Sequence, residues 1–316
     1  MKILSTKIPA VAICVASLCA FTAGQQMADP TFDTSVARPA YAKRHPKILF
    51  DEAHDNFHTA TGRYKPFAEL MKSDGYDVTS NKAKFKAQTL AGYDVLVIAN
   101  ALGEEREDLP GVSTSAFTAE ECYAVRDWVR AGGSLLLIAD HAPYGSAAEG
   151  LASRFGVGMR QGFTNDPANH DADTGRQSFL LFSRDNQLLG EHAITRGRNA
   201  AERVKLVLSF TGQSLKGPPG SVVLLKLSDT AFDVKQPGDK EQTSAAGRAQ
   251  GLAFRFGRGR VVVLGEAAML SAQVIRGEPA QTSFGREEVQ MGMNRKGTDD
   301  RQFALNIMHW LSRLLN

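Results

Sequence analysis

Three apolar runs in this sequence are each long enough for a buried strand, and each ends directly in acidic or histidine residues. Residues 47–50 lead into 51–58, residues 134–139 into 140–145, and residues 261–265 into Glu266. Short apolar runs without alternation are typical of parallel strands that are covered on both faces. The carboxyl ends of parallel strands meet at one edge of a sheet, where ligands bind. The sequence therefore predicts a site at that edge more clearly than it predicts a reaction.

Helical patterns separate these runs. We predict helices at 66–72, 118–131, 147–155 and 299–315, further strands at 77–79, 93–100, 204–209 and 222–227, and a hairpin of 251–256 with 258–264. Thr118 and Glu121 have the spacing of a capping box, and Thr298 is placed to cap the last helix. The alternation of strand and helix is typical of a single α/β domain with a mostly parallel, doubly wound sheet. Residues 101–117 are predicted to form a lid, and 156–183 irregular structure over the site.

The first residues predict export. Lys2 and Lys7 precede a short apolar stretch at 8–21, and small residues follow, as in a signal peptide that is cut near Gly24. We therefore expect residues 1–24 to be removed, residues 25–46 to form a linker, residues 47–316 to form the domain, and the protein to be periplasmic or secreted. A retained membrane anchor is the alternative. Removal of the signal would leave no stable membrane span.

Composition narrows the class of protein. The chain has 316 residues, of which 43% are hydrophobic and 22% charged, as in globular domains. It lacks a basic stripe with interleaved aromatic residues, so we expect no nucleic-acid partner. Cys14 and Cys19 would leave with the signal, so Cys122 alone could form no intrachain disulfide. Cys122 lies within a predicted helix, and we expect it to be buried and unreactive.

The first cluster contains Asp51, Glu52, His54, Asp55 and His58. On a helix, Asp51, His54 and His58 would share one face, as metal ligands need. Because the segment follows a strand and precedes Gly62, a loop is the better prediction. The alternative to a functional site is that these side chains cap backbone groups at a strand-to-loop turn.

The second and third clusters stand at strand ends. Asp140 and His141, followed by Tyr144 and Gly145, occupy the position where hydrolases of the α/β type display a nucleophile, but the sequence has no Ser or Cys there. Glu266 follows the most apolar strand, where an acid is costly unless it is paired or used. The alternatives are a helix cap with a buried histidine for the second cluster, and an arginine partner for Glu266.

A fourth segment delivers a helix N-terminus, which favours anions. It carries Asn294, Asp300 and Arg301, which we assign to substrate binding together with Glu52, His58, Tyr144 and Gly145. Plain helix capping is the alternative for this segment.

Several stretches together resemble a known family. They are KILFDEAHDNFHT, YDVLVIAN, TAEECYAVRDWVRAGGSLLLIADHAPYG, GRGRVVVLGEAAML and RQFALNIMHWLSRLL. They are similar to bacterial class I glutamine amidotransferase-like proteins of the DUF4350 and ThuA-like groups, and HAITRGR at 192–198 is similar to a His-Pro-Ile stretch of such proteins. The resemblance covers most of 47–316 and implies a three-layer flavodoxin-like sheet with helices on both faces.

The departure from that family concerns the nucleophile. Glutamine amidotransferases display a Cys in a Gly-x-Cys-x-Gly elbow, whereas this chain has ADHAPYG at that strand end. Glutaminase activity by that mechanism is therefore not expected. We predict an exported hydrolase-type protein with Asp51, His54, Asp140, His141 and Glu266 as its acid–base groups. The alternative is a non-catalytic module that binds a ligand in the same cleft.

The sequence identifies neither a cofactor nor a specific ligand. No cofactor is established, although a divalent metal would suit this mixture of carboxylates and histidines. Its ligands would be His54, His58, Asp140 and His141. The expected partner is a small-molecule or carbohydrate-like ligand.

Overall fold

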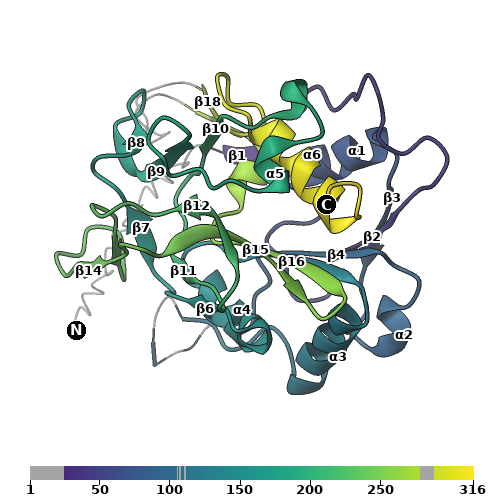
Figure 1. The fold of residues 1–316 in the computed structure, drawn as a ribbon. Helices are drawn as coiled ribbons and strands as arrows, with labels where there is room; N and C mark the ends of the chain where they lie inside the picture. The colour runs from purple at the N-terminus through teal and green to yellow at the C-terminus, as the bar shows by residue number, and fades with distance from the viewer. Residues whose placement is uncertain (1–24, 105, 107, 110–111, 278–287) are drawn as a thin grey trace, which may run out of the picture.

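The computed structural model describes residues 25–104, 106, 108–109, 112–277 and 288–316. Five parallel strands form one side of the largest sheet, from an edge strand inward (Figure 1). In spatial order they are β3 (Asp77–Asn81), β2 (Lys47–Asp51), β4 (Val95–Ala99), β5 (Ser134–Ile138) and β16 (Gly259–Leu264). Because β4, β5 and β16 are buried throughout, their apolar sequences fit strands that are covered on both faces.

Antiparallel strands extend this sheet beyond β16. They are β15 (Ala249–Phe256), β11 (Leu215–Lys216) and β6 (Gly158–Met159), with β12 (Val222–Lys226) also paired to β15. The predicted hairpin is confirmed, since β15 and β16 pair antiparallel from Phe256 and Gly259 onward. The result is a mixed α/β fold whose main sheet is mostly parallel.

Helices cover both faces of the sheet. Above it in Figure 1 lie α1 (Lys65–Ser73), α5 (Ala193–Arg196) and α6 (Asp300–Leu311), and below it lie α2 (Ala87–Leu90), α3 (Ala119–Arg130) and α4 (Tyr144–Ala152). Alternate residues of each strand join different cores: Val97 packs with α1 and α6, whereas Ile98 packs with α3 and α4. Three short 3₁₀ segments, η1 (Ser153–Phe155), η2 (Ala200–Glu202) and η3 (Ala268–Leu270), complete the helical structure.

One of the two predicted helix caps is present. The Thr118 hydroxyl accepts a hydrogen bond from the Glu121 amide and the Glu121 carboxylate accepts one from the Thr118 amide, so the capping box of α3 is confirmed. The predicted Thr298 cap of α6 is wrong. Asp299 is the N-cap residue and makes no side-chain cap, while the Thr298 hydroxyl donates to the Arg295 carbonyl oxygen.

Three small sheets surround the main one. They are β1 (Gln25–Ala28) with β17 (Ala272–Arg276) and β18 (Glu288–Gly292); β8 (His170–Asp171) with β9 (Arg176–Ser183) and β10 (Leu206–Leu208); and β7 (Phe163–Asn165) with β13 (Phe232–Val234) and β14 (Thr243–Ser244). The segment 156–183, predicted to be irregular, thus contributes four strands, one of them eight residues long.

Residues 25–46 also differ from the expected linker. Gln25–Ala28 pairs with β17, and Phe32, Val36 and Tyr41 pack against the core that contains α1 and α6. The Tyr41 hydroxyl lies 2.6 Å from the Ser312 Oγ. This segment therefore lies against the domain along most of its length.

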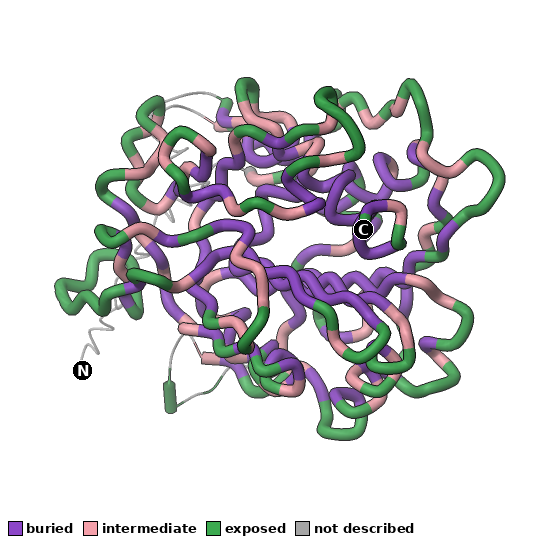
Figure 2. The backbone as a smooth tube through the Cα atoms, in the orientation of Figure 1, coloured by how far each residue is buried: buried purple, intermediate pink, exposed green. Residues whose placement is uncertain are grey.

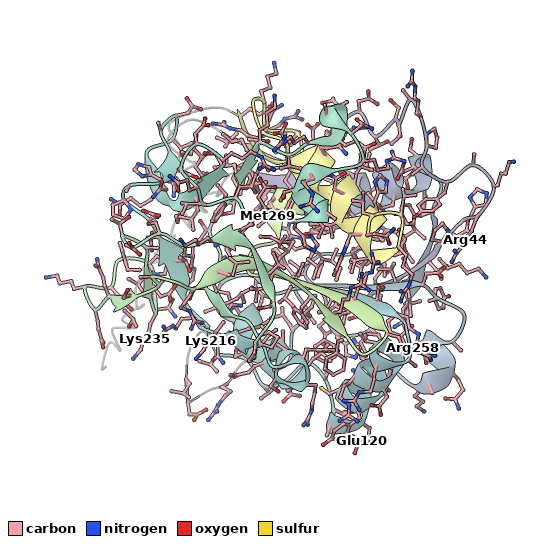
Figure 3. All side chains as sticks on the ribbon, in the orientation of Figure 1. Arg44, Glu120, Lys216, Lys235, Arg258 and Met269 are labelled. Carbon is pink, nitrogen blue, oxygen red and sulfur yellow. The ribbon has the colours of Figure 1, made fainter. Side chains whose placement is uncertain are left out.

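The distribution of side chains follows the layers. The sheet strands are the most continuous buried part of the backbone (Figure 2). Charged side chains such as Arg44, Glu120 and Lys216 point outward, whereas Met269 is fully buried above the sheet (Figure 3). Among the described residues, no helix combines the length and apolar character that crossing a membrane requires. The predicted signal segment 1–24 lies outside the described residues.

Candidate functional site

A cavity of about 290 Å³ lies at the carboxyl edge of the parallel strands. We call it the edge cavity. Its lining residues are Gln26, Phe57, His58, Asp140, His141, Tyr144, Arg176, Phe179, Phe210, Thr211, Glu266, Ala268, Gln273 and Met291. Five of the residues predicted from sequence are among them, and they follow three different strands. None of the described residues of the predicted lid at 101–117 lines this cavity.

The direction of β16 decides where Glu266 lies. β16 runs parallel to β5, with Leu264 beside Ile138. Glu266 and Asp140 each stand two residues beyond that pair, so both lie at the carboxyl edge. An antiparallel β16, which would place Glu266 at the opposite edge of the sheet, is thereby excluded.

Asp140 is a buried carboxyl with few partners. Its Oδ1 accepts a hydrogen bond of 2.8 Å from the His141 amide, and its own amide donates to the Asn100 Oδ1 at 3.0 Å. Burial raises the pKa of Asp140 to about 7, although the hydrogen bonds from His141 and Asn100 oppose this shift. Among the described residues, Asp140 forms no ion pair. Its protonation state therefore changes near neutral pH.

Glu266 is fully buried and receives two backbone amides. Its carboxyl oxygens accept from the amides of Ala268 and Met269 at 2.5 and 2.9 Å, which holds the start of η3. Burial and the neighbouring Asp140 raise the pKa of Glu266 well above its usual range. Two carboxyls that interact in this way differ in protonation, because both cannot ionise cheaply at one site.

Two neutral histidines line the same cavity. Burial lowers the pKa of His58 to about 3, and its Nδ1 is buried without a hydrogen-bond partner. Burial also lowers the pKa of His141, whose Nδ1 lies 2.7 Å from the Ala142 carbonyl oxygen. Since a carbonyl oxygen only accepts, Nδ1 of His141 carries the proton and Nε2 is left as the basic nitrogen. The edge cavity thus holds two histidine rings that burial keeps neutral, beside the two carboxyls.

The sequence prediction missed Phe57, which lines the edge cavity, and two neighbours of Asp140, which are Asn100 and Gln213. Phe57 is 42% exposed at the rim, with the Arg63 guanidinium 4.0 Å from its ring centroid. Asn100 has a φ of +49° and follows β4 directly, so the strand-end argument could have found it. No sequence signal identifies Gln213, whose Nε2 donates to the carbonyl oxygens of Ala139 and Asp140 at 2.9 Å each.

Gly145 is required by the position of Gln213. A Cβ at Gly145 would lie 2.6 Å from both amide atoms of Gln213. We expect Gly145→Ala to displace Gln213 and to lower the free energy of unfolding by about 1–3 kcal/mol through overpacking. Chemical denaturation measures this change. Gly150→Ala in the same helix is the control: there the close neighbour is the Ser115 hydroxyl at 3.0 Å, and no loss is expected. Equal effects of the two substitutions would contradict the role given to Gln213.

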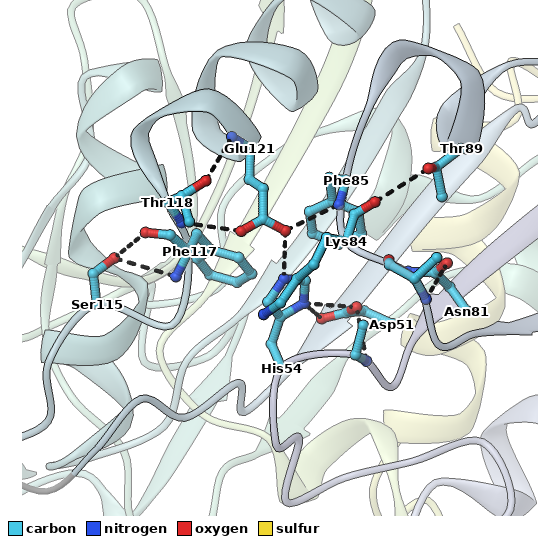
Figure 4. A network of polar contacts seen from close by, with 12 residues as sticks. Asp51, His54, Asn81, Lys84, Phe85, Thr89, Ser115, Phe117, Thr118 and Glu121 are labelled. Carbon is cyan, nitrogen blue, oxygen red and sulfur yellow. Dashed lines mark hydrogen bonds and ion pairs between the residues drawn. The ribbon is translucent and has the colours of Figure 1, made fainter.

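His54 does not share the edge cavity. Its Nδ1 lies 2.9 Å from both carboxyl oxygens of Asp51, and its Nε2 lies 2.9 Å from the Glu121 Oε1 (Figure 4). The rings of Phe85 and Phe117 pack on it with centroids 4.7 and 4.6 Å away. Burial lowers the pKa of His54, but the bonds to Asp51 and Glu121 outweigh burial and hold the pKa above its ordinary value.

The grouping of His54 and Asp51 with Asp140, His141 and Glu266 is therefore corrected. Both ring nitrogens of His54 already face carboxylates, so this histidine binds β2 to α3 and has no nitrogen left for a metal. In the part of the chain that the structure describes, no group of three or more His, Cys, Asp or Glu side chains could hold a metal ion. The set His54, His58, Asp140 and His141 does not form one cluster.

The remaining predicted residues also lie outside the edge cavity. The Glu52 carboxylate accepts from the Ala60 amide and the Ser80 hydroxyl, and Asn294 donates to Asp29 and to the Gln273 carbonyl oxygen. Asp300 accepts from the Leu208 amide, and Arg301 donates to the Ser35 carbonyl oxygen. These contacts join segments of the fold to one another. Cys122 is buried in α3, as expected.

A larger cavity, of about 820 Å³, lies between residues 33–39 and α6. Its charged side chains are largely partnered: Arg198 binds Glu202 at 2.6 Å, and buried Asp74 lies 2.7 Å from His309. The edge cavity differs because its two carboxyls are buried together and form no ion pair with any residue that the structure describes. That difference makes the edge cavity the candidate functional site.

Comparison with known proteins supports a fold and not an activity. No protein-family model matches the sequence, and no curated protein matches it. Among solved structures, the mmIFT52 N-terminal domain is similar over 84% of this chain and 97% of its own, with a TM-score of 0.58 and 14% identity. A likeness at this identity concerns the fold alone.

ThuA-like and glutamine amidotransferase-type folds are also among the structural neighbours. A ThuA-like protein from Bacteroides uniformis covers 90% of this chain and 95% of its own, with a TM-score of 0.43 and 14% identity. A protein of the GMP synthase type from Thermoplasma acidophilum covers 85% and 96%, with a TM-score of 0.40 and 11% identity. These scores are too low to transfer residues or activities to this chain.

Proposed function

We propose that the edge cavity is the acid–base site of a hydrolase that acts on a small polar molecule, and that the chain is exported. The observation that carries the proposal is the burial of two carboxyls, Asp140 and Glu266, in one cavity with two neutral histidines. Perturbed carboxyls of this kind are typical of catalytic acids and bases. Structural ion pairs also perturb pKa values, but neither carboxyl is in an ion pair among the described residues.

The two carboxyls would take different roles. Above about pH 7 Asp140 is ionised and can accept a proton from an attacking water, while Glu266 keeps its proton and can donate it to the leaving group. The water oxygen forms the new bond, and the leaving group departs with the proton from Glu266. His141, through Nε2, would hold the substrate or the water. This division needs no Ser or Cys nucleophile.

The family proposal rests on topology. The parallel strands β3-β2-β4-β5-β16 are the second, first, third, fourth and fifth in chain order, which is the order of flavodoxin-like sheets. We propose a three-layer flavodoxin-like, class I glutamine amidotransferase-like fold of the ThuA-like type, without glutaminase activity. In flavodoxin-like sheets ligands bind where the strand order reverses, here between β2 and β4, and His58 and Asn100 follow these strands.

Turnover with a pH profile tests the proposal. Purified protein would be assayed against chromogenic esters, amides and glycosides between pH 4 and 9. We expect turnover of at least one class, with kcat/KM rising toward a plateau as the pH passes about 7, because Asp140 must lose its proton. Absence of turnover on every class, or a rate that does not change across this range, would contradict the acid–base role.

The non-catalytic alternative predicts a different outcome. A binding module would hold a small-molecule or carbohydrate-like ligand in the edge cavity without converting it. Its affinity would be measurable by calorimetry, while product would stay undetectable at every pH. The same samples therefore distinguish a hydrolase from a binding module.

A further inference from the structure

A second cavity, of about 330 Å³, adjoins the edge cavity, and we call it the side cavity. Arg176 and Thr211 line both cavities. A ring pair also joins them: His141 lines the edge cavity, Phe163 lines the side cavity, and the two rings stack with centroids 4.5 Å apart. A ligand that contacts His141 would therefore reach the side cavity by extending past Thr211.

The shared wall has an unfavourable backbone conformation. Thr211 has a φ of +78°, which is rare for a β-branched residue. Its amide donates to the Ser178 carbonyl oxygen at 2.9 Å, and the two side-chain hydroxyls lie 2.9 Å apart. Such conformations persist where surrounding contacts determine them, and they cluster at ligand sites. The fold thus maintains the shape of the boundary between the two cavities.

The side cavity offers ring faces together with polar groups. Phe163 and Phe232 are half-buried and come from the paired strands β7 and β13, in which Phe232 lies opposite Asn165. The amides of Asn165 and Gln242 and the hydroxyl of Ser178 lie in the same lining. Aromatic surface with a few hydrogen-bonding groups is typical of sites for ring-shaped polar ligands.

We infer that the side cavity is a second binding subsite for the substrate of the edge cavity, and that this substrate has two ring-sized polar units. The reacting unit would lie beside Asp140, and the second ring would pack against Phe163 and Phe232. Each cavity is near the lower limit of ligand-site volumes, about 300–1,000 Å³, whereas the two together would hold a two-ring molecule. The inference rests on the proposed function for the reacting unit only.

Matched pairs of probes test the subsite without requiring turnover. Methyl and phenyl β-glucosides form one pair, and the methyl and phenyl amides of N-acetylglycine form another. Affinities would be measured by saturation-transfer NMR and calorimetry. We expect the phenyl member of at least one pair to bind tenfold or more tightly than its methyl partner. Phe232→Ala should remove that preference and leave the methyl member unchanged.

Two further variants make the result decisive. Phe256 is also half-buried, lies at the carboxyl end of β15 and lines neither cavity. Phe256→Ala is therefore the control and should keep the phenyl preference. Gln242 is exposed, so Gln242→Ala should fold normally and should weaken a 4-carbamoylphenyl probe by about two- to tenfold while sparing the phenyl probe.

Each outcome has a defined reading. Absence of a phenyl preference in both pairs, or a preference that survives Phe232→Ala, would overturn the subsite. A phenyl preference without any turnover would support the subsite and count against the proposed hydrolase. Turnover without a phenyl preference would support the proposed hydrolase and overturn the subsite.

Discussion

Replacing His54 with leucine is expected to lower the free energy of unfolding by about 3–5 kcal/mol, because it leaves two buried carboxylates without their cationic partner. Asp51 and Glu121 each lie 2.9 Å from a ring nitrogen of His54, and all three side chains are almost completely buried. Urea denaturation measures the change. Lys72→Met, which removes an exposed ion pair with Glu69, is the control and should cost no more than about 1 kcal/mol.

The pH dependence of this stability difference tests whether the charge of His54 causes it. The pKa of His54 is raised in the folded protein, so its contribution to stability is complete below the unfolded value of 6.5 and is lost as the pH rises through the folded value. The difference between wild type and His54→Leu should therefore be larger at pH 6 than at pH 9. A difference that is independent of pH would mean that His54 acts through packing against Phe85 and Phe117 alone.

The strand-end argument located much of the site because it depends on topology and not on exact boundaries. Asp140 follows β5 and Glu266 follows β16, and the parallel pairing of these strands brings them to one edge. The same argument would have found Asn100 after β4. His58 and Tyr144 also line the edge cavity, at the positions expected from the first and second clusters.

The position of His54 was not predicted correctly by the strand-end argument. His54 and His58 are four residues apart after the same strand, yet the first packs between Phe85 and Phe117 and the second against Tyr64. Between them Asp55 has a φ of +44°, so the loop turns and sends the two side chains in different directions. Sequence spacing does not encode such a turn when no glycine marks it.

The segments that cover the site were the least predictable. The strands β7 and β13 of the side cavity have three residues each, and they pair with one another from distant parts of the sequence. In residues 25–46, Phe32, Val36 and Tyr41 pack on the core without any helical or strand period, so only the polar composition of the segment was visible. Nonlocal packing of this kind leaves little trace in a single sequence.

Asp140→Asn is expected to reduce kcat/KM by about 10²–10⁴-fold above pH 7, because asparagine cannot accept a proton from water. Its side-chain oxygen can still accept the His141 amide, so the loop geometry should be kept. The rise of the rate near pH 7 should disappear along with the activity. Asp77→Asn, at an exposed position at the start of β3, is the control and should leave both the rate and the pH profile unchanged.

Asp140→Asn should also be more stable than wild type at neutral and alkaline pH, but not at acidic pH. The folded pKa of Asp140 is about 7 and its ordinary value is 3.8, so the contribution of Asp140 to wild-type stability falls as the pH rises from about 4 to 7 and is constant above. At about 1.4 kcal/mol for each pH unit, Asp140→Asn should be more stable than wild type by up to about 4 kcal/mol at pH 8 and by little at pH 4. Urea denaturation at the two pH values measures this. If Asp140 is a catalytic carboxyl that the fold keeps at a cost in stability, the variant should lose turnover and gain stability at pH 8. Lost turnover with lower stability at pH 8 would instead assign Asp140 a structural role.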